Sequence, residues 1–80
     1  MANIRDLKAL VSKAERIEET DPRGALVRYE EAERKILWDL YRNWGLTVSE
    51  IGDGSGVLGL YKRLYERIMD GYRRLSTRKT

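Results

Sequence analysis

The side chains that could do chemistry in this chain are carboxylates, lysines, tyrosines and hydroxyls, because its 80 residues include neither histidine nor cysteine. Catalysis by Ser–His or Cys–His pairs, or by a histidine general base, is therefore excluded. The same absence removes disulfides and the usual zinc ligands. The remaining carboxylates, lysines and tyrosines form no constellation typical of an active site. The sequence therefore predicts a binding protein without enzymatic activity, cofactor or metal.

The charged residues are distributed unevenly along the chain. Its net charge is +3, whereas residues 61–80 alone carry seven basic and two acidic side chains, a net charge of +5. One explanation is a solvated helix face crossed by i,i+4 ion pairs, of which Glu31–Lys35 would be an example. The other is a basic stripe that meets an acidic partner helix or a phosphate backbone. Under the second explanation, the C-terminal part of the chain holds the binding surface.

The elements that must position these residues are helices. Apolar residues recur at three- and four-residue steps over residues 4–19, 22–44 and 57–75. Between the first two segments, Asp21 is a preferred N-cap and Pro22 fits the first position of a helix, where its missing N–H has no cost. A short connection of this kind makes the first two helices antiparallel neighbours.

A glycine-rich connection separates the second and third predicted helices. Four glycines lie between residues 52 and 59, and each would destabilise a helix interior by about 1 kcal/mol relative to alanine. Residues 45–56 are therefore predicted to form a flexible loop that begins with Gly45 as a left-handed helix cap. Residues 76–80 are predicted to be a flexible tail. With no strand-like alternation, residues 1–80 are predicted to form one all-α domain, a three-helix bundle made of an antiparallel helical hairpin and a third, basic helix.

The sequence contains no transmembrane signal. No apolar run approaches the roughly 20 residues that a membrane-spanning helix needs. The first six residues already include an acidic side chain, which is not typical of a signal peptide. We therefore expect a cytoplasmic protein. Arginine outnumbers lysine eleven to five and there are only two asparagines, a composition that is frequent in proteins of thermophiles.

Small and aromatic residues follow a recognisable spacing in the second predicted helix. Residues 25–32 read Ala-Leu-Val-Arg-Tyr-Glu-Glu-Ala, with Ala14 and the Asp21 turn before them. Alanine leaves room for a neighbouring helix, and tyrosine fills the space one turn later. In these features, residues 10–40 resemble the MIT (microtubule-interacting and trafficking) domain, a family of three-helix bundles of about this length. The resemblance implies an adaptor that binds the short helical tail of an ESCRT-III-type protein between its second and third helices.

Binding of a helix in a groove requires apolar pockets with charged rims. The candidates that the resemblance implies on this chain are Trp38, Tyr41, Leu60, Leu64 and Tyr65 for the pockets, and Lys62, Arg63 and Arg67 for the rim. All of the pocket candidates except Trp38 also lie on or near the core stripes of their helices, so a simple packing role is the alternative. Trp38 lies off the apolar face, and its exposure would indicate a binding surface.

A second hypothesis is nucleic-acid binding. Residues 46–57 could mimic the first helix and turn of a helix-turn-helix, with Lys62, Arg63 and Arg67 on the recognition helix. The glycines in this segment and the acidic residues near it, such as Glu66, argue against it. An irregular loop over residues 46–56 would count further against it, whereas a short helix would favour it. A third hypothesis is an oligomeric scaffold that uses the same apolar stripes at a subunit interface.

Overall fold

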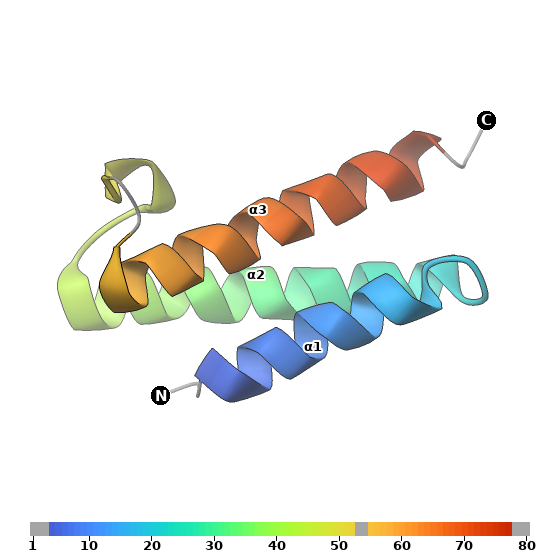
Figure 1. The fold of residues 1–80 in the computed structure, drawn as a ribbon, viewed down its shortest axis with the longest axis horizontal. Helices are drawn as coiled ribbons and strands as arrows, with labels where there is room; N and C mark the ends of the chain where they lie inside the picture. The colour runs from blue at the N-terminus through green and yellow to red at the C-terminus, as the bar shows by residue number, and fades with distance from the viewer. Residues whose placement is uncertain (1–3, 53–54, 78–80) are drawn as a thin grey trace.

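The computed structural model describes residues 4–52 and 55–77 of the chain. Within these ranges it contains no strand and consists of α1 (Ile4–Ile17), α2 (Pro22–Trp44), a 3-10 turn η1 (Val48–Glu50) and α3 (Gly56–Thr77). α1 and α3 run in one direction along α2, which runs in the opposite direction (Figure 1). All three helices contact one another, so the prediction of an all-α three-helix bundle is confirmed.

The caps of α2 explain why this helix has the limits expected from the sequence. The Asp21 carboxylate accepts a hydrogen bond from the Gly24 N–H (3.0 Å), and Pro22 takes the first helical position. At the other end, Gly45 adopts φ 65° and its N–H donates to the Tyr41 carbonyl (3.0 Å). The predictions of an Asp21 N-cap and a left-handed Gly45 cap are confirmed.

The other two helices differ from their expected limits by one or two residues. α1 ends at Ile17 rather than at residue 19, and the Asp21 N–H donates to the Ile17 carbonyl (2.7 Å) in the turn toward α2. Asp21 itself has the non-helical backbone (φ −147°) of the N-cap of α2. α3 spans Gly56–Thr77 and so takes up the first two residues of the predicted tail, while residues 78–80 lie outside the described residues. No helix in the described ranges is long and apolar enough to cross a membrane.

The connection between α2 and α3 is partly folded onto the bundle. Glu50 Oε1 accepts hydrogen bonds from both the N–H and the hydroxyl of Thr47, each at 2.9 Å, and these bonds lower the pKa of Glu50. The next side chain, Ile51, is buried in the core. Of the segment predicted as a flexible loop, residues 53–54 lie outside the described residues. The 3-10 turn and Ile51 thus fix the described part of this connection against the helices.

The core combines aliphatic residues and alanines from all three helices with the fully buried Tyr29. The Tyr29 ring lies against Gly71 of α3, at a place where any side chain would collide with it. The Tyr72 ring packs edge-on against the same ring, with 6.0 Å between the centroids. Gly71 therefore allows α2 and α3 to approach closely. The buried apolar residues are Leu7, Val11, Ala14, Ala25, Tyr29, Ala32, Ile36, Leu40, Ile51, Tyr61, Leu64, Ile68 and Leu75.

A buried polar cluster joins the three helices beside Tyr29. The Tyr29 hydroxyl donates to the carboxylate of Glu18, a buried residue directly after α1. Arg74 of α3 donates to both oxygens of that carboxylate, from Nε at 2.9 Å and from Nη2 at 2.8 Å. Burial and the bond to Glu18 raise the pKa of Tyr29. The cluster therefore satisfies a carboxylate that would be costly to bury without partners.

Candidate functional site

Acidic and basic side chains pair across the α1–α3 seam in the C-terminal halves of these two parallel helices. Glu15 of α1 accepts two hydrogen bonds from Arg67 of α3, at 2.6 Å from Nη2 and 3.1 Å from Nε. Arg67 also donates to the Ser12 hydroxyl (3.2 Å). About two turns farther along α3, Arg74 holds Glu18 in the buried cluster. Among the described residues, Arg67 and Arg74 thus each meet a carboxylate in this half of the seam.

The N-terminal half of the same seam is open and forms a groove of about 460 Å³. We call it the α1–α3 groove, and its lining consists of Ile4, Arg5, Lys8, Leu60, Arg63, Leu64 and Arg67. Three of these side chains are aliphatic and the other four are basic. No acidic residue is among the described residues of the lining. The groove is thus an apolar depression with a cationic rim.

The electrostatic environment of the groove favours an anionic ligand. The N-termini of α1 and α3 lie at the same end of the bundle (Figure 1), where the helix dipoles add partial positive charge. Lys8 and Arg63 are exposed and form no ion pair with any of the described residues. Arg67 is held by Glu15, whose hydrogen bond raises the pKa of the guanidinium. Of the four cations around the aliphatic floor, Arg67 is therefore fixed by Glu15, and Lys8 and Arg63 are available.

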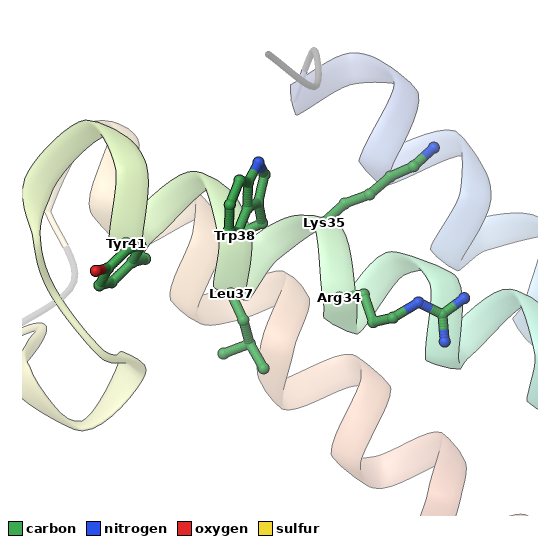
Figure 2. A pocket seen from close by; sticks show the side chains of 5 residues that line it. All are labelled: Arg34, Lys35, Leu37, Trp38 and Tyr41. Carbon is green, nitrogen blue, oxygen red and sulfur yellow. The ribbon is translucent and has the colours of Figure 1, made fainter.

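A second exposed surface lies on the outer side of α2. We call it the α2 ridge, and it consists of Arg34, Lys35, Leu37, Trp38, Tyr41 and Arg42. Trp38 and Tyr41 are 57% and 69% exposed, and their rings stack with 6.3 Å between centroids. The Arg42 guanidinium lies 5.6 Å from the centre of the Trp38 ring. Lys35 and Trp38 project to one side of α2 and Leu37 to the other (Figure 2).

The structure divides the eight residues predicted for partner binding among three surfaces. Trp38 and Tyr41 lie on the α2 ridge. Four others, Leu60, Arg63, Leu64 and Arg67, line the α1–α3 groove. The remaining two, Lys62 and Tyr65, line a shallow hollow beside η1. A hollow between α2 and α3 does exist near Tyr72, but none of the eight residues lines it. The structure therefore brings half of the candidates together, although between α1 and α3 and not between α2 and α3.

Several of the candidates have packing roles that the sequence did not separate from binding. Leu64 is buried, and Lys62 holds the connection in place by donating to the Gly52 carbonyl (2.9 Å). By contrast, Tyr41 and Leu60 were expected on or near core stripes, yet Leu60 is 41% exposed and Tyr41 is more exposed still. The exposure of Trp38 agrees with its position off the apolar face.

Sequence reasoning missed the side of the groove that α1 contributes. Arg5, Lys8, Ser12 and Glu15 follow one another at steps of three and four residues, so they form one face of α1. The first two are basic, and the last two are the partners of Arg67. The change along this face of α1, from basic residues to residues that accept hydrogen bonds, was the sequence signal for the groove. The signal could be interpreted only with the knowledge that α3 packs along this face of α1.

The described part of residues 46–56, proposed as part of a helix-turn-helix, does not form the required helix. Their described part consists of the three-residue turn η1, extended flanking residues and the first residue of α3. The segment therefore provides no first helix for a helix-turn-helix, which removes the main support for that geometry. The basic side chains of α3 are also shared among different surfaces and a salt bridge.

Comparisons with protein-family models, with curated proteins and with solved structures found no match to the chain. The resemblance of residues 10–40 to the MIT domain therefore stays a prediction. What the protein binds has to be inferred from the shape and charge of its own surfaces.

Proposed function

We propose that the protein is a non-enzymatic helical interaction module that binds a short, acidic, amphipathic segment of a partner protein in the α1–α3 groove. The observation that carries this proposal is the contrast between the two halves of one seam. In the C-terminal half, Glu15 and Glu18 pair with Arg67 and Arg74 of α3. In the N-terminal half, the groove lining contains, besides the paired Arg67, the basic residues Arg5, Lys8 and Arg63 and no acidic residue among the described ones. Carboxylates of a partner would form, in the N-terminal half of the seam, the kind of ion pairs that Glu15 and Glu18 form in its C-terminal half.

The aliphatic floor of the groove explains why the segment should be amphipathic. Ile4, Leu60 and Leu64 line the groove, and Leu60 is partly exposed. A partner helix with aliphatic residues at i and i+3 or i+4 places two side chains on one face, as binding of a helix in a groove requires. Full burial of each such side chain stabilises the complex by about 1.5–3 kcal/mol before the cost of ordering the peptide. Two such side chains contribute roughly 3 to 6 kcal/mol before that cost, so we expect a weak complex with a dissociation constant of about 0.1 to 1 mM.

The proposed partner is of the class that the MIT resemblance implies, a short helical tail, but the binding surface is a different one. An ESCRT-III-type tail is therefore one test peptide, and a designed helix is the other. The designed peptide has about 14 residues, roughly four helical turns, with leucines on one face and glutamates beside them. A scrambled peptide of the same composition separates amphipathic binding from simple charge attraction.

The deciding experiment measures binding of the fluorescein-labelled designed peptide by anisotropy, with the intact chain and two charge-reversal variants. Arg63→Glu changes the rim of the groove. Arg73→Glu makes the same change on the same helix at an exposed position outside the groove, where Arg73 forms an ion pair with Asp70. We expect at least tenfold weaker binding, about 1.4 kcal/mol, for Arg63→Glu and less than a twofold change for Arg73→Glu. Equal weakening by both variants would refute the site, and tight binding of duplex DNA with a steep salt dependence would favour the nucleic-acid hypothesis instead.

A further inference from the structure

The exposed large apolar side chains of the described residues gather on α2. They are Val27, Leu37, Trp38, Tyr41 and Trp44 on α2, with Val57 and Leu60 on α3. Isolated exposed apolar residues need no explanation, but a concentration on one helix indicates an interface. Tryptophan, tyrosine and arginine are also the residues that contribute most to protein–protein binding, and all three types occur on the α2 ridge.

The spacing of these residues suits a second helix as the occupant. Val27, Glu31, Arg34, Trp38 and Tyr41 follow one another at steps of four, three, four and three residues, the spacing of a helix–helix seam. At 1.5 Å per residue, the distance from Val27 to Tyr41 is about 21 Å. A stripe of this length, with a carboxylate within it, matches a helix better than it matches a few stacked bases.

The order of charges along the ridge points to a second copy of the chain as that helix. The N-terminal part of the stripe contains Glu31, whose carboxylate forms an exposed ion pair with Lys35 of the same helix (3.0 Å) and keeps room for a second cation. The middle of the stripe contains Arg34, and its C-terminal part contains the aromatic pair and Arg42. In an antiparallel pair of α2 helices related by a two-fold axis at the level of Ile36, each Glu31 faces the C-terminal part of the other ridge. Each Arg34 then reaches Trp38 of the second copy. A parallel pair would instead place like charges opposite each other.

From this complementarity we propose that two copies of the chain associate through their α2 ridges as an antiparallel dimer. Trp38 is then covered on one side by Arg42 of its own chain, as the single chain already shows, and on the other by Arg34 of the second copy. The isologous contact is self-complementary, which is the usual form of a two-fold interface. Because a ridge of one helix is smaller than the roughly 800 Å² per partner of a standard interface, the dimer has a dissociation constant in the micromolar range.

The dimer does not depend on the proposed peptide binding, because the two surfaces share no residue. The dimer nevertheless affects the proposed peptide binding, because each dimer presents two α1–α3 grooves. A partner that carries two acidic segments would gain avidity from such an arrangement.

Sedimentation equilibrium of the full chain, from about 1 to 500 µM around the expected dissociation constant, tests the proposal. The intact chain of 9.4 kDa should shift to twice that mass as its concentration rises. Trp38→Glu should weaken association at least tenfold, and Val57→Glu, an equally exposed apolar position on α3, should change it less than twofold. Circular dichroism of both variants verifies that they fold. A chain that stays monomeric throughout, or a dimer that Trp38→Glu leaves intact, would overturn the proposal.

A charge exchange tests the antiparallel arrangement. Glu31→Arg and Arg42→Glu should each weaken the dimer. The double variant should recover most of the lost affinity, because an arginine at position 31 again faces a glutamate at position 42 of the second copy. A double variant no stronger than the single ones would overturn the arrangement. Poly-uridine, added as a probe, should leave the dimer intact. Displacement of the dimer by poly-uridine, together with binding that salt abolishes, would assign the ridge to single-stranded nucleic acid and overturn the proposal.

Discussion

Replacement of Gly71 by alanine should destabilise the bundle, although the same change stabilises an exposed helix by about 1 kcal/mol. A Cβ atom at this position would lie 2.7 Å from the Tyr29 hydroxyl oxygen and still closer to two ring carbons. The ring has little freedom to move, because its hydroxyl is bonded to Glu18 and its edge packs against Tyr72. The contact can therefore be relieved only if α2 and α3 separate or the hydroxyl leaves its carboxylate partner.

The magnitude follows from three contributions. Overpacking of a core costs about 2 kcal/mol, and a weakened hydrogen bond to a charged group costs about 1.5 kcal/mol. The gain in helix propensity returns about 1 kcal/mol. We therefore expect a net loss of roughly 2 to 3 kcal/mol in the free energy of unfolding, and a drop in Tm of at least 10 °C or so for a chain of this size.

Urea unfolding followed by circular dichroism provides the measurement. Gly52→Ala is the matched control, because nothing lies within 4 Å of the added methyl group and the φ angle of Gly52 is not positive. The free energy of unfolding of this variant should stay the same or rise by up to ~1 kcal/mol. In a Tyr29→Leu background, Gly71→Ala should no longer be destabilising, since the ring is gone. If Gly71→Ala leaves the stability of the intact chain unchanged, or lowers it equally in both backgrounds, the close approach of α2 and α3 is refuted.

Three further outcomes follow from the described contacts. Arg74→Met should cost about 3 kcal/mol in urea unfolding because it leaves the Glu18 carboxylate buried without its cation, whereas Arg73→Met at an exposed ion pair should cost less than ~0.5 kcal/mol. Burial and the hydrogen bond to a carboxylate raise the pKa of Tyr61 to about 12, so the folded state disfavours the ionised phenol. The free energy of unfolding should therefore be at its full value below pH 10 and decline as the pH rises through 12. A free energy of unfolding that is flat from pH 9 to 12 would contradict this. Gly45→Ala should cost about 1 kcal/mol, since φ is 65° there, and an unchanged Tm would show that the cap relaxes.

The parts of the fold that depend on neighbouring residues were predictable from the sequence. Asp21, Pro22 and Gly45 determine where α2 begins and ends through bonds to residues within four or five positions, so the residue types are sufficient to locate them. The three apolar stripes likewise identify three helices, because burial of one face needs only the helical period.

The arrangement of the site depends on pairings between distant residues, which periodicity does not encode. Arg67 was expected on the rim of a groove with α2, but its guanidinium binds Glu15, 52 residues away in sequence. That bond turns this face of α3 toward α1 and makes Lys8 part of the groove. Tyr41 shows the reverse case: its spacing suits a core position, but the core side of α2 is already filled, and the ring lies in solvent.

The most direct test of the proposed function is an NMR titration of the ¹⁵N-labelled chain with the designed acidic peptide. The peptide should shift the amide signals of Lys8, Leu60 and Arg63 in a saturable way, and leave those of Trp38 and Tyr41 on the α2 ridge unchanged. The peptide should shift the same signals of Lys8, Leu60 and Arg63 in the Trp38→Glu variant, in which the proposed dimer is lost. Saturable shifts confined to the α2 ridge, or none anywhere at millimolar peptide, would contradict peptide binding in the α1–α3 groove.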